Sequence, residues 1–263
     1  MPFTILNDAL IHYADEGPRD APALAMLNSL GTDLRIWDAV AALLTPRFRV
    51  IRADKRGHGL STLPAGSEGM GVFARDTAAL MDRLGVKRAT IVGLSIGGLI
   101  AQELHRQRPD LVAALVLCDT AVKVGNEQSW DGRIAMVESG GIASFADKVM
   151  QVWFSAAFHA AQPETVAGYR TMLVRQPVDG YIMACRALRA ADLRPHAGQI
   201  RVPTLCMVGE EDGSTPPPMV RETAGLIAHA RFELIKGAGH IPNVEQPELV
   251  TSLIEAHARL ALA

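Results

Sequence analysis

Residues 93–98 read GLSIGG and follow the apolar run ATIV (89–92). One serine, Ser95, therefore fits the pattern G-x-S-x-G between an expected strand (89–95) and an expected helix (96–107). The chain must turn sharply there, which forces the serine into a strained backbone conformation and lifts its hydroxyl above the sheet. The flanking glycines are needed because a side chain at either position would collide with a neighbouring strand or helix. We predict that Ser95 is a nucleophile.

Two other functions of a glycine-rich turn are excluded by the residues themselves. A phosphate-binding loop would read G-x-x-x-x-G-K-[ST], and no lysine follows here. A dinucleotide-binding turn would read G-x-G-x-x-G, but Ser95 stands where the second glycine is needed. A chance match in an ordinary loop is the remaining alternative, and the strand–turn–helix context argues against it.

Short apolar runs alternate with helical patterns over most of the chain. FTIL and ALIHYAD, joined by Asn7-Asp8, predict a hairpin. Further strands are expected at 23–30, 48–54, 111–119, 204–212 and 231–240, and further helices at 33–44, 73–84 and 247–260. This alternation indicates an α/β protein with a mostly parallel sheet covered by helices on both faces.

Residues 121–195 interrupt the alternation, because they contain no strand-like run. Several helix-sized stretches there are separated by glycine and proline. We interpret this segment as a helical cap, or lid, inserted above the carboxyl edge of the sheet, where ligands of such sheets bind. Residues 1–120 and 196–263 would then form the core domain.

Composition limits the class of protein. The chain has 263 residues, of which 49% are hydrophobic, so one large domain or a domain with an insertion is expected. The net charge is −2 and basic residues are scattered, which speaks against a nucleic acid partner. Neither a signal peptide nor an apolar stretch of about 18 residues is found, so we expect a cytoplasmic protein with no membrane partner. Whether the chain forms a homo-oligomer is left open.

No cofactor or metal is expected. The three cysteines, Cys118, Cys185 and Cys206, are isolated in the sequence. No pair of histidines stands at ligand spacing with a carboxylate. Any chemistry must then come from side chains and backbone groups.

A serine hydroxyl needs a base, and histidine suits that role because its charge changes near neutral pH. His240 in KGAGHIPNVEQP follows the last expected strand, at the sheet edge where Ser95 is also expected. His58 in DKRGHGLS also follows a strand, but its flanking glycines indicate a structural turn. We predict His240 as the base, with an ordinary surface histidine as the alternative.

An acid is needed to hold the histidine in one tautomer and to balance its charge. Where a serine turn of this kind occurs, the acid lies between the serine and the histidine in the chain. Asp212 in VGEEDGSTPP follows a strand and precedes a helix, so it is the predicted acid. Asp119, after another strand, is its rival, whereas Glu210 and Glu211 are expected in solvent.

Two backbone N–H groups are expected to stabilise an oxyanion. One belongs to Ile96, the residue after the serine. The other is assigned by position to Leu30, in the loop NSLGT (28–32) that follows an expected strand. The alternative for this loop is a simple polar turn.

These stretches resemble the α/β-hydrolases, and in particular the 3-oxoadipate enol-lactonases. Fold signals shared with many esterases are DKRGHGLS (54–61), GLSIGG (93–98), GEEDGSTP (209–216) and GAGHIPNVEQP (237–247). Stretches that resemble the lactonases more specifically are LNSLGTDLRIWD (27–38), LCDTAVKVG (117–125), WF (153–154) and GYIMACRALRAADLRP (180–195). At positions 117–121 the lactonases more often read LCNTA, whereas this chain reads LCDTA and has Asp119 in place of the asparagine. Asp119 would then alter the pocket or compete for His240.

The resemblance implies an α/β-hydrolase fold with the triad Ser95, Asp212 and His240, and with Leu30 and Ile96 as oxyanion donors. It also implies hydrolysis of a small anionic lactone, 3-oxoadipate enol-lactone, to 3-oxoadipate through an acyl-enzyme, in the catabolism of aromatic compounds. Alternatives on the same fold are a general carboxylesterase, a perhydrolase and a carbon–carbon bond hydrolase. A binding protein that uses the pocket without turnover is an alternative of another class.

Such a substrate carries a second carboxylate, which needs a cation in a partly dry pocket. The cap supplies the arginines Arg133, Arg170, Arg175, Arg186, Arg189 and Arg194. We favour Arg133, because it closely follows Trp130 where the chain enters the cap. Trp153 is expected as an apolar pocket wall together with Trp130, and packing within the cap is the alternative for Trp153.

Overall fold

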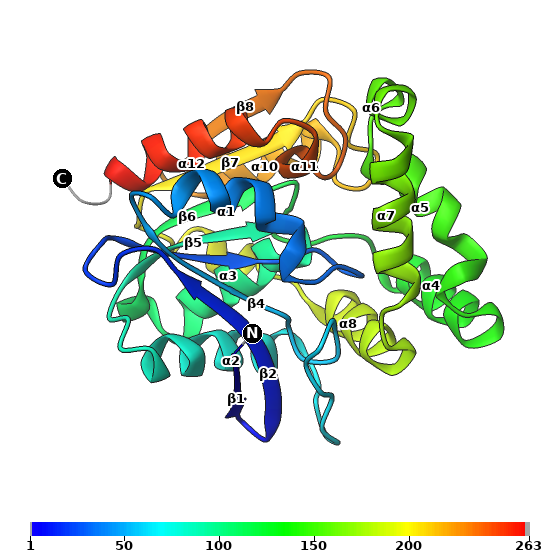
Figure 1. Ribbon diagram of the computed structural model, residues 1–263, viewed down its shortest axis with the longest axis horizontal. Helices are drawn as coiled ribbons and strands as arrows, with labels where there is room; N and C mark the ends of the chain where they lie inside the picture. The colour runs from blue at the N-terminus through cyan, green and yellow to red at the C-terminus, as the bar shows by residue number, and fades with distance from the viewer. Residues whose placement is uncertain (1, 261–263) are drawn as a thin grey trace.

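A computed structural model describes residues 2–260 of the chain (Figure 1). Within them, eight strands form one sheet in the order β1-β2-β4-β3-β5-β6-β7-β8. β1 (Phe3–Leu6) and β2 (Ala9–Glu16) form the predicted hairpin, and β2 pairs antiparallel with β4 (Arg49–Ala53). All further pairs are parallel. The predicted, mostly parallel sheet is confirmed.

The remaining strands are β3 (Ala23–Leu27), β5 (Ala89–Leu94), β6 (Val112–Cys118), β7 (Thr204–Gly209) and β8 (Arg231–Ile235). β5 and β7 are buried along their whole length, as central strands covered on both faces must be. Their carboxyl ends are nearly level, since Leu27 pairs with Gly93, Leu94 with Cys118, and Cys118 with Met207. The loops that leave these strands therefore meet at one edge of the sheet.

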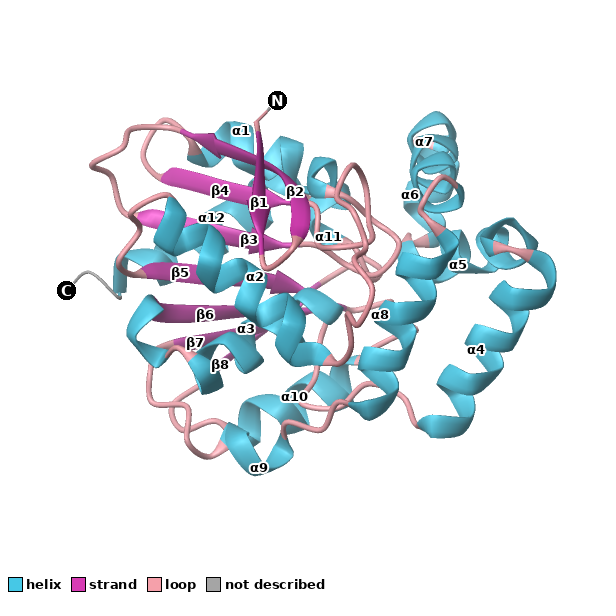
Figure 2. Cartoon of the chain, turned by 90° about the horizontal axis from the view of Figure 1, so that it is seen from below, coloured by secondary structure: helices cyan, strands magenta, loops and turns pink. Residues whose placement is uncertain are grey.

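Helices cover both faces of the sheet (Figure 2). One layer contains α2 (Met70–Arg83), α3 (Ile96–Gln107) and α10 (Pro217–Leu226), and the other contains α1 (Asp38–Leu44) and α12 (Pro247–Leu260). Short helices complete the core: η1 (Leu34–Trp37), η2 (Pro109–Leu111), α9 (Arg194–Ala197) and α11 (Pro242–Glu245). The apolar faces follow helical spacing, as in α12, where Val250, Ile254 and Ala258 are buried.

Two helix boundaries differ from the sequence prediction. The helix expected at 33–44 is divided into η1 and α1, because Trp37 has a non-helical backbone conformation with φ −101° and ψ 1°. The helix expected at 73–84 begins three residues earlier, at Met70. It follows Gly69, whose φ of 73° sets the end of the preceding loop.

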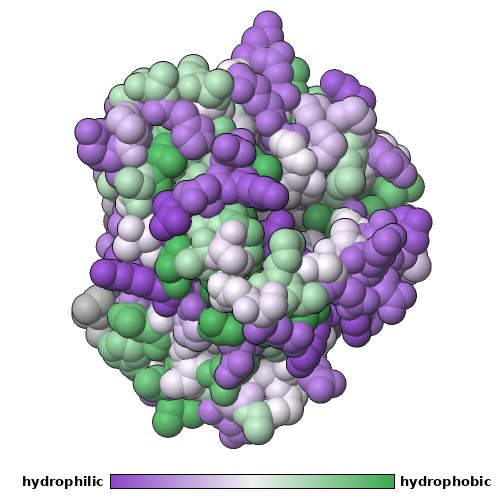
Figure 3. Space-filling view, turned by 90° about the vertical axis from the view of Figure 1, so that its right-hand side faces the viewer, coloured by the Kyte–Doolittle hydropathy of each residue, from purple (hydrophilic) through white to green (hydrophobic). Residues whose placement is uncertain are grey.

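The helices of the expected cap lie between β6 and β7, beyond the carboxyl ends of the strands (Figure 1, green to yellow-green). They are α4 (Glu127–Gly140), η3 (Ile142–Phe145), α5 (Ala146–Trp153), α6 (Ala156–Ala161), α7 (Pro163–Val174) and α8 (Val178–Ala190). Figure 3 faces this end of the molecule, where hydrophilic and apolar side chains are mixed. The division into core and cap at residues 121 and 195 stays a prediction. Within residues 2–260, none of the helices combines the length and the apolar character needed to cross a bilayer.

Candidate active site

Ser95 lies at the turn between β5 and α3, with φ 56° and ψ −120°. This positive φ is the strained conformation expected of a serine lifted above a sheet. The N–H of Ser95 donates to the carbonyl oxygen of Cys118 (2.9 Å), and the hydroxyl of Thr120 donates to the carbonyl oxygen of Ser95 (2.6 Å). These bonds fix the turn to the end of the neighbouring strand β6.

The two glycines of the turn leave no room for a side chain. A Cβ atom at Gly93 would lie 2.3 Å from the carbonyl oxygen of Gly97. A Cβ atom at Gly97 would lie 2.3 Å from the carbonyl oxygen of Leu27, at the end of β3. Both distances are far inside van der Waals contact with backbone atoms, so the steric requirement expected from the sequence is present.

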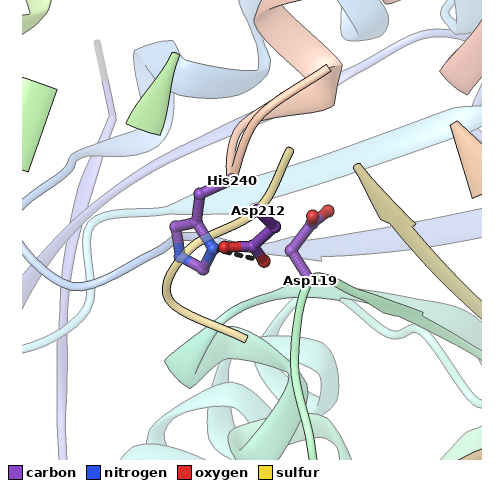
Figure 4. A group of neighbouring side chains, drawn as sticks. All are labelled: Asp119, Asp212 and His240. Carbon is purple, nitrogen blue, oxygen red and sulfur yellow. Dashed lines mark hydrogen bonds and ion pairs between the residues drawn. The ribbon is translucent and has the colours of Figure 1, made fainter. Parts of the chain in front are cut away.

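His240 and Asp212 form a buried pair at the same edge of the sheet (Figure 4). Asp212 follows β7 and His240 follows β8. His240 Nδ1 lies 2.9 Å from Asp212 Oδ2. Asp212 also accepts hydrogen bonds from the N–H of Ser214 (2.7 Å) and from the N–H and hydroxyl of Thr215 (3.1 and 2.6 Å). A carboxylate held in this way favours a proton on Nδ1 and leaves Nε2 able to accept another.

The charge state of Asp212 follows from these contacts. Burial acts to raise the pKa of Asp212, but the charge of His240, its hydrogen bond and those from Thr215 outweigh burial and lower that pKa below its ordinary value. Asp212 is therefore ionised at neutral pH and can balance a positive charge on His240.

Asp119 is a second buried carboxyl group beside this pair (Figure 4). It follows β6 with φ 45°, and its Oδ1 accepts a hydrogen bond from the N–H of Gly209 (2.9 Å). Burial and then the charge of Asp212 raise the pKa of Asp119 well above its ordinary value. One polar atom each of Asp119, Asp212 and His240 lies within 4.8 Å of the others. A metal ion could span such atoms, but Nδ1 of His240 and Oδ2 of Asp212 are hydrogen-bonded to each other.

A cavity of about 220 Å³ lies over Ser95. Ser95, His240, Ser29 and Leu30 line the side of the cavity that belongs to the sheet edge, and residues of the cap line the opposite side. Ser95 and His240 thus line the same cavity, and Asp212 is hydrogen-bonded to His240. His58 is 0% exposed and is not among the described residues that line this cavity.

The two predicted oxyanion donors lie near Ser95. Ile96 is the first residue of α3, so its N–H has no partner within that helix. Leu30 lines the cavity, and within residues 2–260 its N–H donates to no backbone or side-chain acceptor. Both N–H groups are therefore available to an oxygen atom placed above Ser95.

The three cap residues predicted for the substrate pocket, Arg133, Trp130 and Trp153, all line the cavity. Trp130 is held by a hydrogen bond from its Nε1 to the carbonyl oxygen of Val124 (2.7 Å). The guanidinium group of Arg133 lies 4.6 Å from the ring centre of Phe145. Its Nη1 is 3.4 Å from the hydroxyl of Tyr181. The guanidinium group of Arg133 thus contacts two aromatic side chains, neither of which is charged.

The other cap arginines are engaged elsewhere. Four of them form ion pairs with acidic side chains: Arg170 with Asp147, Arg186 with Glu138, Arg189 with Asp131, and Arg194 with Asp192. Arg175 lines a different hollow, on the side of β2. Within residues 2–260, Arg133 has no carboxylate within ion-pair distance, and it is the only one of the six cap arginines that lines this cavity, so among them it remains the candidate for binding an anion.

Sequence reasoning missed several residues of the cavity wall. Phe145, Lys148 and Tyr181 line it and were not predicted. A signal for part of this wall was available, because Phe145, Val149 and Trp153 recur at intervals of four residues. That spacing places them on one face of a helical segment. Tyr181 lies far away in the sequence and carries no such signal.

Glu245 connects the loop of His240 to the cap. Its Oε1 accepts a hydrogen bond from the N–H of Gly239 (2.7 Å), and its Oε2 accepts one from the hydroxyl of Ser155 (2.5 Å). The N–H of Ile241 donates to the carbonyl oxygen of Trp153 (3.2 Å). The residues on both sides of His240 are therefore bonded, directly or through Glu245, to the segment that leads into α6.

Comparisons with known proteins show the family to which the chain belongs. The family model of the alpha/beta hydrolase fold matches residues 22–247. 3-Oxoadipate enol-lactonase 2 of Acinetobacter baylyi is 34% identical over 95% of this chain and 93% of its own length. 3-Oxoadipate enol-lactonase 1 of that organism is 32% identical over 88% and 86%. The solved structure of the enol-lactonase from Burkholderia xenovorans LB400 is 36% identical, with a TM-score of 0.94 over 97% of this chain and 99% of that chain. The chain therefore belongs to the α/β-hydrolase fold family, as its motifs predicted, and is a hydrolase.

Proposed function

We propose that the protein hydrolyses 3-oxoadipate enol-lactone to 3-oxoadipate, as a step in the catabolism of aromatic compounds. The enol-lactonases that resemble this chain over most of its length support this substrate. The observation that carries the proposal is the placement of Arg133. Its guanidinium group pairs with no carboxylate of residues 2–260, and Arg133 lines the same cavity as Ser95.

The cavity suits a small anionic lactone. A guanidinium group can donate two parallel hydrogen bonds to a planar carboxylate. The aromatic side chains of Trp130, Phe145 and Trp153 line the same space and exclude water, which strengthens such a contact. With its carboxylate bound to Arg133, a small lactone can place its ring carbonyl near Ser95.

In the first half of the reaction, Ser95 Oγ attacks the carbonyl carbon of the ring while His240 Nε2 accepts the hydroxyl proton. Asp212 balances the charge that forms on His240, and the N–H groups of Leu30 and Ile96 bind the developing oxyanion. Collapse of the tetrahedral intermediate breaks the ring C–O bond, and His240 gives its proton to the leaving oxygen. The ring opens to an enol that stays attached to the acyl chain.

In the second half, conversion of the enol to the ketone removes the nucleophile that would close the ring again. Water then gives a proton to His240 Nε2 and attacks the acyl carbon. The bond from that carbon to Ser95 Oγ breaks, and the proton passes from His240 to Ser95. The product leaves as a dicarboxylate, and Ser95 is restored.

The test is the rate of loss of 3-oxoadipate enol-lactone for the wild type and for Ser95→Ala, with p-nitrophenyl acetate as a neutral comparison ester. We expect rapid loss of the lactone with the wild type and none above background with Ser95→Ala. Turnover of the ester alone would reject the lactone and favour a general carboxylesterase. Turnover of neither, with Ser95 unlabelled by a fluorophosphonate, would reject catalysis and favour a binding protein.

A further inference from the structure

The predicted oxyanion donor Leu30 belongs to a tight turn from Ser29 to Thr32. The N–H and the hydroxyl of Thr32 both donate to the carbonyl oxygen of Ser29, at 3.3 and 2.9 Å. Gly31 completes the turn with φ 75°, in the left-handed region that favours glycine. These bonds determine the shape of the turn, but they do not determine how it is oriented towards Ser95.

Lys55 makes a contact that does set this orientation. It follows β4, and its Nζ donates to the carbonyl oxygens of Ser29 (2.6 Å) and Thr32 (3.2 Å). Both ends of the turn are therefore bound to one ammonium group. Lys55 lines a separate hollow together with Asn28 and Asp54, and it is not among the described residues that line the cavity over Ser95.

The peptide bond between Ser29 and Leu30 relates this contact to the direction of the N–H of Leu30. Within residues 2–260 no peptide bond is cis, and in a planar trans peptide the C=O and the N–H point in opposite directions. Because the oxygen of Ser29 points to Lys55, the N–H of Leu30 points away from Lys55, and Leu30 lines the same cavity as Ser95. We propose that Lys55 is a positioning residue of the oxyanion hole, which orients the Ser29–Leu30 peptide so that its N–H faces the oxygen above Ser95.

The ammonium group also acts on the strength of that donor. A cation bound to a carbonyl oxygen polarises the peptide and makes its N–H a better hydrogen-bond donor. Burial lowers the pKa of Lys55 to about 7, although Asp54 and Asp33 act to raise it. The chain thus keeps a lysine where its charge is costly, as proteins often do at functional sites.

The proposal rests on the proposed serine chemistry but not on the identity of the lactone, and Lys55→Met tests it. This change keeps the carbon stem and removes the donors. We expect kcat to fall about 10- to 100-fold for both the lactone and p-nitrophenyl acetate, with KM changed less than about threefold, because a whole oxyanion donor contributes about 10²- to 10³-fold. The affinity for a trifluoromethyl ketone that forms a tetrahedral adduct should fall by the same factor as kcat/KM.

Lys87→Met is the matched control, because the side chain of Lys87 is exposed, and it should behave as the wild type. Retention of kcat within about threefold in Lys55→Met would overturn the proposal, as would a loss of kcat with no loss of affinity for the ketone. If the wild type cleaves only the ester, the lactone is rejected and the Lys55 test remains valid with the ester.

A second variant keeps the test valid if Lys55→Met does not fold. Alkylation of Lys55→Cys with 2-bromoethylamine forms a C–S bond, releases bromide and restores an ammonium group at nearly the length of lysine. The native cysteines of the described chain are buried, so wild-type protein treated in the same way is the control. Recovery of kcat to within about threefold of the wild type supports the proposal, and complete alkylation without recovery overturns it.

Discussion

The carboxyl groups of Asp119 and Asp212 share one buried space, but only that of Asp212 is hydrogen-bonded to His240. The pKa of Asp212 is lowered and that of Asp119 is raised. Opposite shifts in neighbouring carboxyl groups favour the ionised form of Asp212 and the protonated form of Asp119. In its protonated form Asp119 adds no second negative charge beside His240.

Asp119→Asn should make the fold more stable than the wild type at alkaline pH. The pKa of Asp119 is higher in the folded than in the unfolded chain, so folding retains a proton that unfolding releases. The contribution of Asp119 to the stability of the wild type must then fall as the pH rises above the ordinary pKa of aspartate, about 4. Asparagine has no such dependence and keeps an oxygen for the N–H of Gly209. Urea unfolding at about pH 4, 6 and 8 measures the difference, which should grow with pH.

The opposite pH dependence of stability in Asp119→Asn would contradict this prediction. If Asp119→Asn is less stable than the wild type by a margin that grows from about pH 4 to about pH 8, then Asp119 is ionised in the folded protein. Its kcat/KM at neutral pH should stay within about threefold of the wild type, because asparagine has nearly the shape of aspartic acid and keeps an oxygen for the N–H of Gly209.

Asp212→Asn should lower kcat by about 10⁴-fold with little change in KM. An amide cannot balance a positive charge on His240, and its N–H favours the wrong tautomer of the ring. Steady-state kinetics with the ester and the lactone measure the loss, and a melting curve checks the fold. Asp119→Asn is the comparison, since it changes the neighbouring carboxyl group in the same way. A collapse of kcat in Asp119→Asn but not in Asp212→Asn would identify Asp119 as the acid.

Arg133→Met should raise KM for the lactone by about 30-fold, which corresponds to the loss of about 2 kcal/mol from a charged hydrogen bond. Hydrolysis of neutral p-nitrophenyl acetate should be nearly unchanged, since that ester has no carboxylate. Arg170→Met is the matched control, because Arg170 pairs with Asp147 outside the cavity. Equal effects of Arg133→Met on both substrates would show that Arg133 supports the structure of the cap and does not recognise an anion.

Gly97→Ala should destabilise the fold by about 2–4 kcal/mol, because its Cβ would meet backbone atoms of β3 that cannot move aside. Gly132→Ala is the contrasting change: Gly132 lies within α4, and a Cβ there has no atom within 4 Å. Alanine at this site should stabilise by about 0.5–1 kcal/mol. Thermal unfolding distinguishes the two, and a Gly97→Ala protein as stable as the wild type would contradict the steric account of the turn.

The features that could be predicted from the sequence are those whose physical cause lies in residues close by in the chain. The turn at Ser95 depends on glycines within two positions of it, so the motif contains its own steric cause. Asp212 and His240 were predictable because each follows a strand of a parallel sheet, and the ends of such strands meet at one edge. Sequence rules also placed the start of each strand to within one residue, since the apolar runs are local, but β3, β7 and β8 end three to five residues before the expected ends.

The features that were not predictable depend on side chains distant in the sequence. Six cap arginines looked alike, and only folding shows that Arg170 meets Asp147 whereas Arg133 meets aromatic rings. Lys55 reaches a turn more than twenty residues earlier, and no motif encodes that contact. The division of helix 33–44 follows from the backbone of Trp37, which is fully buried in the core, so packing decided it.

Glu245, which binds Gly239 and Ser155 at once, has a mechanical consequence. A displacement at the start of α6 is passed through one carboxylate to the residue next to His240. The position of the loop that carries His240 therefore depends on the position of the start of α6. The carboxylate of Glu245 thus makes the cap part of the support that holds the catalytic histidine loop in place.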